Sequence, residues 1–211
     1  MGQSQGKIAC VKILHYIFGF DILAVIKWKG DDTMDTLEAI MTRKSVRNFT
    51  DQAISDEALE TILKTGMSGP SCVNARDWSF VVTRESELLK KMADANGRPA
   101  DPLRGAALGI LVLGDLERAF KPAPDYWIID GSIAAQNMIL AAHAMGIGSV
   151  WLGTYPQMER VEEQRKLLGL PDTVIPHSIL AFGYPDSSKE TISGDTRNDR
   201  YESNRIHMDK W

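Results

Sequence analysis

The sequence predicts one globular domain in which helices and strands alternate along the chain. Its 211 residues, 44% hydrophobic and 25% charged, have the composition of an ordinary soluble domain, and such a length buries a core without metals or disulfides. Two apolar runs, at 78–83 and 108–113, are typical of buried strands. Other stretches repeat their apolar residues at helical spacing. These observations together favour a fold that mixes helices and strands.

Two helices are predicted ahead of the first strand. Residues 37–41 place apolar side chains at helical spacing just before a basic segment. Ser55 is a suitable N-cap for a second helix, whose apolar stripe ends before Gly66. The loop at 69–74 is rich in Pro, Ser and Asn, which favour ordered turns, and it leads to the strand at 78–83.

Four further elements and a tail are predicted after the strand at 108–113. The elements are a long helix with Asp130 as N-cap and Gly146 as C-cap, a strand at 149–152, a helix at 157–168 ended by Gly169, and a strand at 174–182. Residues 197–211 are polar and show little periodicity, which predicts an extended C-terminal arm.

Residues 1–33 do not fit this pattern. The mostly apolar run at 8–28 would suit a membrane helix or a secretory signal, but Lys12 and Asp21 interrupt it and no small-residue cleavage site follows. The amphipathic pattern that follows predicts a domain over 34–211, preceded by an extension or a misassigned start. We therefore expect no membrane partner, and a cytoplasmic protein with cysteine thiols.

The charge balance and the known motifs exclude several classes of protein. The 24 Lys and Arg against 28 Asp and Glu give a formal net charge of −4, so no overall basic field favours nucleic acid. The four histidines lack a metal-ligand spacing, so no metal site is expected. The chain contains no Walker loop, no complete dinucleotide fingerprint and no nucleophile elbow.

A basic segment is the strongest candidate site. Arg43, Lys44, Ser45 and Arg47 combine three cations with a hydroxyl, which suits a phosphate group, although a solvated basic face would have the same sequence. In the loop at 69–74, Asn74 could read the edge of a heterocycle or simply form a turn. Cys72 could be imagined as a nucleophile, but no feature of the sequence lowers its pKa.

Six motifs occur in a characteristic order. They are RKSVRNF at 43–49, PSCVN at 70–74, AQNM at 135–138, MGIGSVWLG at 145–153, GYP at 183–185 and RY at 200–201. In this order they resemble the nitroreductase family of flavin mononucleotide (FMN) enzymes. The resemblance covers 34–211, so residues 1–33 are an extension outside the family pattern.

The resemblance implies both a fold and an assembly. The fold would be an α+β three-layer sandwich, with a mixed central sheet flanked by helices. Two chains would form a homodimer with FMN at the subunit interface, and the extended C-terminal arm would wrap around the partner.

The resemblance also implies an FMN site. Arg43, Lys44, Ser45 and Arg47 would hold the phosphate and the ribityl chain, with Arg47 reaching toward the ring. Arg200 would close on the phosphate from the C-terminal arm. No metal and no catalytic side chain are expected, because the cofactor itself carries the redox chemistry.

Further residues are implied around the ring. Pro70 and Ser71 would come from the partner subunit, and Asn74 would contact the polar edge of the ring. The other face would be lined by Trp151, Leu152 and Gly153. A backbone N–H at about Gly153 or Thr154 would lie near the ring nitrogen that accepts hydride, and glycine permits close approach of the main chain. The sequence departs from the family at Arg76-Asp77, where Gln-Pro is common.

The implied activity is electron transfer from NADH or NADPH to nitroaromatics, quinones or similar small acceptors by a ping-pong mechanism. Segments 96–104 and 121–127 are expected to act as lids that select the acceptor. A specialised flavin reductase such as a reductive dehalogenase, a non-catalytic flavin-binding sensor and a phosphate-binding module without flavin are alternative interpretations.

Overall fold

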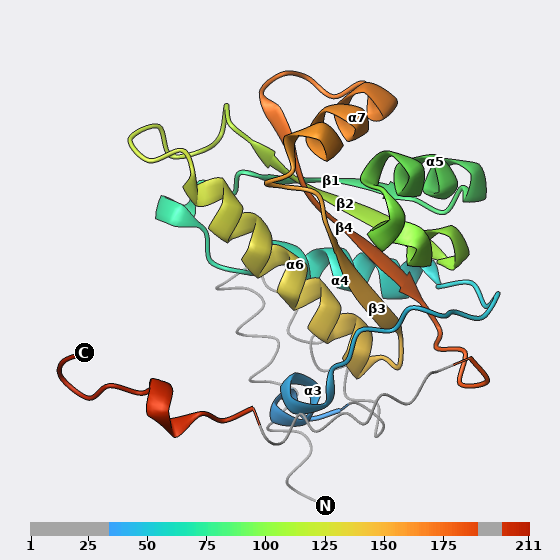
Figure 1. Ribbon diagram of the computed structural model, residues 1–211, viewed down its shortest axis with the longest axis horizontal. Coiled ribbons are helices and arrows are strands. Elements are labelled where there is room, and N and C mark those ends of the chain that lie inside the picture. Colours follow the sequence, from blue (N-terminus) through green and yellow to red (C-terminus); the bar gives the residue numbers. More distant parts are fainter. Residues whose placement is uncertain (1–33, 190–199) are drawn as a thin grey trace, which may run out of the picture. The chain divides into compact units, whose positions relative to one another are not determined.

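The computed structural model describes residues 34–189 and 200–211 (Figure 1). The expectations for residues 1–33 lie outside this part of the chain. Within it, no helix combines the length and the apolar character needed to cross a bilayer.

The described elements follow one another as helices and strands in alternation. In chain order they are α3 (Thr36–Thr42), α4 (Asp56–Met67), η1 (Cys72–Asn74), β1 (Trp78–Thr83), α5 (Ser86–Asn96), η2 (Arg98–Gly105), β2 (Leu108–Asp115), α6 (Tyr126–Ala144), β3 (Gly148–Gly153), α7 (Met158–Leu168), β4 (Val174–Gly183) and η4 (Ser203–Arg205). Every helix and strand predicted from the sequence is present. Helix α5 and the 3₁₀ segment η2 were not predicted.

The four described strands form one sheet in the order β1-β2-β4-β3, and all neighbouring strands pair antiparallel, rather than in the mixed sheet that the resemblance implies. In the described residues, parallel pairing is confined to a single bridge between Ser45 and Ser149. A β-bulge between Val112 and Leu113 shifts the register of β2 against β4. Because β3 is the last strand in the order, one of its edges is open to other parts of the chain.

Helices cover both faces of the sheet, which confirms the three-layer α+β fold (Figure 1). One core joins α4 and α6 to a face of the sheet through residues such as Ile62, Met138 and Phe182. The other joins α5 and η2 to the opposite face through Leu89, Leu103 and their neighbours, with part of α7 packed against it. The segment expected to act as a lid at 96–104 is therefore anchored in the core, through the buried residues Asn96, Ala100 and Leu103.

Local signals explain two of the helix ends. The Ser55 hydroxyl accepts a hydrogen bond from the Ala58 N–H at 3.2 Å, so the predicted N-cap is confirmed. Helix α7 ends at Gly169, whose φ of 63° is the left-handed conformation that glycine adopts easily. Gly66, predicted to follow α4, lies inside it because α4 packs tightly on α6: a Cβ there would lie 2.3 Å from Met138 Cε.

One predicted cap is wrong. Asp130 lies inside α6, four residues after its first residue, and it is 2% exposed. Its carboxylate instead accepts the Cys72 N–H, at 3.1 and 3.0 Å to the two oxygens. Asp130 therefore caps the short η1 segment, which lies 58 residues earlier in the chain.

Candidate functional site

The open edge of β3 presents backbone groups to the surrounding chain. The Val46 N–H donates to the Ser149 carbonyl at 2.8 Å, so the backbone groups of Ser149 face away from β4. Side-to-side alternation in a strand puts those of Trp151 and Gly153 on the same edge. The edge from Ser149 to Gly153 is ~13 Å long at the usual rise per residue.

The basic segment lies at the Ser149 end of this edge. The bridge to Ser149 fixes Ser45, and Lys44, Ser45 and Arg47 are exposed while Arg43 is half-buried. Within the described residues, no ion pair engages the guanidinium groups of Arg43 and Arg47. Positive charge without a carboxylate partner, next to a hydroxyl, suits an anionic group such as a phosphate.

Two buried apolar side chains hold the basic segment on the sheet. Val46 is 5% exposed and packs against Gly148, while Phe49 is 9% exposed and packs against Gly183. A Cβ at Gly148 would lie 2.8 Å from Val46 Cβ, and one at Gly183 would lie 2.8 Å from Phe49 Cβ. Glycine at both positions is therefore required for the segment to approach the strands so closely.

Substitution of Gly148 tests this packing. We expect Gly148→Ala to displace Val46 and to reduce the unfolding free energy by roughly 2 kcal/mol, a typical cost of overpacking. The displacement should also weaken the binding of FMN at the basic segment. Chemical denaturation and FMN titration measure the two effects. Gly105→Ala is the matched control, because nothing lies within 4 Å of its Cβ position. Equal stability of the two variants would contradict the packing argument.

The Gly153 end of the edge is built from backbone and buried polar side chains. The Gly153 carbonyl accepts from Asn96 Nδ2 at 3.1 Å and from Arg160 Nη1 at 2.9 Å. The Thr154 N–H lies 3.4 Å from the His177 carbonyl, and Thr154 Oγ1 donates to Asn96 Oδ1 at 2.8 Å. Of the two N–H groups considered from the sequence, that of Gly153 therefore faces away from β4. A Cβ at Gly153 would meet no atom within 4 Å, so a ligand can approach the main chain.

Side chains of β3 alternate between surface and core. Trp151 is 36% exposed, while Leu152 is 4% exposed and belongs to the core beside α5 and α7. Only the backbone of Leu152 can therefore belong to the predicted site. The Trp151 ring contacts the His177 ring edge-on, with 5.5 Å between centroids, and Trp127 contacts the same histidine at 5.8 Å.

His177 supports this aromatic group as a neutral side chain. It is 5% exposed, and its ring nitrogens lie within hydrogen-bond distance of Ser132 Oγ, the Ile128 carbonyl and Ser178 Oγ. Burial lowers the pKa of His177 to about 4, partly opposed by the Ile128 carbonyl.

His177 should make stability depend on acid pH. Because its folded-state pKa lies below the unfolded value of 6.5, the stabilisation is complete above pH 6.5 and is lost as the pH falls through about 4. We expect His177→Gln to be less stable than the native chain at pH 7, with a deficit that shrinks as the pH approaches 4.5. Chemical denaturation of both proteins at several pH values measures this. A deficit independent of pH would contradict the assignment.

The loop that carries Pro70, Ser71 and Asn74 lies far from the basic segment within one chain. Its Cys72 N–H binds Asp130 in α6, whereas Thr42, just before the basic segment, contacts His143 Nε2 of the same helix at 2.8 Å. The thirteen residue steps from Asp130 to His143 span ~20 Å of helix. One chain therefore does not bring the two groups of predicted residues together.

The same loop has a constrained backbone. Val73, Asn74 and Arg76 have positive φ values of 45°, 59° and 52°. Such a value is unusual for a β-branched residue such as Val73. The Arg76 side chain donates to Asn74 Oδ1 at 3.0 Å, and the Arg76 N–H donates to Ser71 Oγ at 3.0 Å. Arg76, one of the departures from the family pattern, therefore ties together two residues of the predicted site.

Asp77, the other departure, is fully buried. Neither carboxylate oxygen has a hydrogen-bond donor in the described part of the chain. Burial, and then the neighbouring charge of Asp130, raise the pKa of Asp77 to about 6. Burial and the same two carboxylates raise the pKa of the Cys72 thiol, which disfavours a nucleophilic thiolate.

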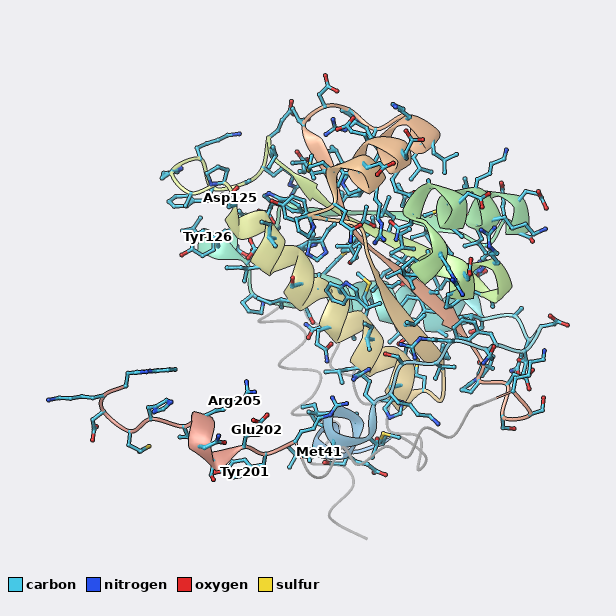
Figure 2. The ribbon with its side chains drawn as sticks, viewed as in Figure 1. Met41, Asp125, Tyr126, Tyr201, Glu202 and Arg205 are labelled. Atoms are coloured by element: carbon cyan, nitrogen blue, oxygen red, sulfur yellow. The ribbon has the colours of Figure 1, made fainter. Side chains whose placement is uncertain are left out.

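Arg200 is the last of the candidate site residues predicted from the sequence. Arg200 is exposed at the start of the second described segment, and its role at the site stays a prediction. The tail holds its own ion pair, Arg205 Nε to Glu202 Oε2 at 2.6 Å (Figure 2). In residues 34–189 and 200–211, no cluster of His, Cys, Asp and Glu could hold a metal ion.

The sequence did not predict the roles of the Asn96, Thr154 and Arg160 side chains, although it pointed to the backbone of Thr154. Asn96 and Thr154 are fully buried, and their partners lie more than fifty residues away in the chain. Arg160 is one of several charged residues in α7, so its spacing carried no signal.

Comparison with known proteins identifies similar chains. The family model described as Nitroreductase matches residues 40–111 and 97–184. An Archaeoglobus fulgidus protein named "Putative NADH dehydrogenase/NAD(P)H nitroreductase" is 42% identical over 177 residues, which are 84% of this chain and 99% of that protein. The NADPH-flavin oxidoreductase of Vibrio harveyi is 30% identical over 166 residues, covering 74% of this chain and 68% of that protein. A solved structure of an FMN-dependent nitroreductase from Clostridium difficile R20291 has a TM-score of 0.73 and 26% identity, and the match covers 83% of this chain and 99% of that one.

Proposed function

Because this chain belongs to the nitroreductase family, we propose that it is an FMN-dependent oxidoreductase that takes electrons from NADH or NADPH. We further propose nitroaromatics, quinones or similar planar compounds as acceptors, in a ping-pong mechanism. The observation that carries the proposal is the open edge of β3, with the basic segment at one end and an accessible glycine backbone at the other.

The residues present fit FMN in their chemistry. Arg43, Lys44, Ser45 and Arg47 would hold the phosphate and the ribityl chain, since they offer cationic and hydroxyl donors within five residues of the chain. The edge of ~13 Å gives a phosphate and a flexible chain room before the ring reaches Gly153. Open space at Gly153 would accept a flat ring beside the main chain.

FMN, when bound, supplies the transfer of two electrons from the nicotinamide to the acceptor. The chain's own residues would bind the cofactor, orient its ring and shield part of it from solvent. The Gly153 N–H would donate to the ring nitrogen, and Trp151 would cover part of the ring from the side of α6. No side chain needs to act as an acid or base, which leaves the acceptor to be selected mainly by shape.

A homodimer would complete the site. Helix α6 is apolar on nearly all sides, yet Tyr126 and Ile129 are 44% and 52% exposed, and a groove of about 430 Å³ runs along its outer face between Ile128 and Asn137. Met41 of α3, which packs on α6, is also exposed (Figure 2). A second copy covering this face would bring its own Pro70, Ser71 and Asn74 toward the basic segment, as the separation of ~20 Å along α6 requires.

Two expectations extend this proposal. We place the enzyme in the cytoplasm, where NADH, NADPH and a reduced Cys72 thiol are found. We also retain 34–211 as the catalytic domain, with residues 1–33 as an extension to it and Arg200 closing on the phosphate.

Steady-state kinetics tests the proposed activity. The oxidation rate of NADH and of NADPH would be measured against varied concentrations of a nitrofuran and of a short-chain benzoquinone. If the donor leaves before the acceptor binds at the same face of the flavin, double-reciprocal plots give parallel lines for each pair of substrates. Intersecting lines would contradict the ping-pong mechanism, and no turnover with either acceptor class would contradict the proposed substrates.

A further inference from the structure

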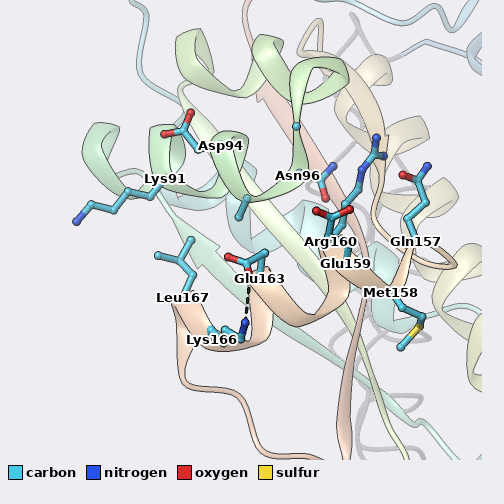
Figure 3. Close-up of a pocket in the computed structure, with 12 residues that line it drawn as sticks. Lys91, Asp94, Asn96, Gln157, Met158, Glu159, Arg160, Glu163, Lys166 and Leu167 are labelled. Carbon is cyan, nitrogen blue, oxygen red and sulfur yellow. Dashed lines mark hydrogen bonds and ion pairs between the residues drawn. The ribbon is translucent and has the colours of Figure 1, made fainter.

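The backbone at Gly153 is held by side chains that the proposed function leaves without a role. Asn96 at the end of α5 and Arg160 in the first turn of α7 both donate to the Gly153 carbonyl. Figure 3 shows Arg160 reaching from α7 toward Asn96, at one end of the pocket between these helices. Asn96 also accepts from Thr154 Oγ1, so its amide engages both residues that follow Leu152.

This arrangement fixes a residue that would otherwise be flexible. Glycine has the widest conformational freedom of all residues, and Gly153 is the last residue of β3, where ladder pairing ends. Two donors on one carbonyl restrict that freedom, and the bond from Arg160 is charge-assisted. Asn96 and Thr154 are fully buried and satisfy each other, so they form a rigid base for the peptide.

Arg160 also brings a positive charge to this position. Within the described residues no ion pair engages its guanidinium group, whereas the neighbouring Glu163 pairs with Lys166 at 3.0 Å. Arg160 is half-buried, so its field is less screened than that of an exposed side chain. The Arg160 guanidinium would therefore contribute a positive potential to a group bound beside Gly153.

We propose that Arg160 is a positioning residue that holds Gly153 through its carbonyl and favours the reduced form of the flavin bound there. The inference rests on the proposed function, since it concerns FMN at that site. Reduced flavin carries more negative charge than oxidised flavin, so a nearby cation binds the reduced form more tightly. Asn96 supplies the rigid geometry, and Arg160 supplies geometry and charge.

The test compares three substitutions by the midpoint potential and the dissociation constant of bound FMN. Arg160→Gln removes the charge and keeps a donor, Arg160→Lys keeps the charge, and Lys166→Gln removes an exposed charge from the same helix. Because Arg160 is only half-buried, these variants should fold, and circular dichroism checks this. The potential is measured anaerobically against a reference dye, without an acceptor substrate.

We expect Arg160→Gln to prefer reduced over oxidised FMN about tenfold less than the native protein does. For a two-electron couple this lowers the midpoint potential of bound FMN by about 30 mV. Arg160→Lys and Lys166→Gln should stay within threefold of the native protein. An unchanged potential in Arg160→Gln, an equal fall in Lys166→Gln, or no rescue by Arg160→Lys would overturn the inference while leaving the proposed function intact. Failure of the native protein to bind FMN would instead overturn the proposed function.

Discussion

Replacing Arg43 and Arg47 together with alanine is expected to weaken FMN binding by about 100-fold or more, since each hydrogen bond to a charged group contributes roughly 1.5–3 kcal/mol. Both guanidinium groups flank Ser45, which the bridge to Ser149 fixes on the edge of the sheet. Neither belongs to an ion pair in the described part of the chain, so their removal leaves no carboxylate unpaired. The fold should therefore survive the double substitution, and the loss should be confined to binding.

The measurement is a fluorescence titration of FMN with the FMN-free protein. The matched control is Arg98→Ala with Arg118→Ala, which removes the same charge from two exposed positions outside the candidate site. The control should bind FMN within threefold of the native protein, and the salt dependence of binding should fall only in the Arg43 and Arg47 variant. Equal affinity of the two double variants would show that the basic segment is only a solvated face.

Asp77→Asn is expected to increase the unfolding free energy by up to ~3 kcal/mol at pH 7.5. The pKa of Asp77 in the folded protein, about 6, is about two units above the model value of 3.8, and each unit corresponds to about 1.4 kcal/mol. The folded state therefore holds the proton more tightly, so the stability from protonated Asp77 is full below about pH 4 and is lost as the pH rises through 6. Asparagine has the same shape, stays neutral and can donate toward Asp130.

Chemical denaturation of FMN-free protein at pH 4.5 and pH 7.5 measures this effect. The gain from Asp77→Asn should be large at pH 7.5 and small at pH 4.5. Asp51→Asn, at an exposed position, is the control and should change stability little at either pH. In the native chain, protonation of His177 lowers stability as the pH falls, whereas protonation of Asp77 raises it. The stability of the native chain should therefore vary less with pH than that of Asp77→Asn or of His177→Gln. A gain of the same size at both pH values would contradict a buried, proton-binding Asp77.

Predictions from the sequence succeeded where the signal is local. Apolar runs gave the strands, and Ser55 and Gly169 gave helix ends, because a cap depends on residues within one turn. Asp130 was misread because an acidic residue within an apolar helix has the sequence signature of an N-cap. Its actual partner, the Cys72 N–H, becomes a neighbour only through the packing of the loop on α6.

The candidate site was predictable in part for the same reason. Ser45 and its basic neighbours stand together in the sequence, and the sheet places them beside Ser149 as one group. The support of Gly153 was not predictable, because Asn96 and Arg160 come from two different helices and meet only at its carbonyl. The core position of the Leu152 side chain follows from strand alternation, which motif matching does not consider.

The most direct test of the central claim is a visible absorption spectrum of the purified protein, followed by anaerobic addition of NADH and, separately, NADPH. An FMN-dependent oxidoreductase predicts a flavin spectrum that bleaches within the time of turnover with at least one of the two donors. A flavin spectrum that neither donor bleaches would contradict the proposed activity. A colourless protein that FMN cannot reconstitute would contradict the assignment of the β3 edge as a flavin site.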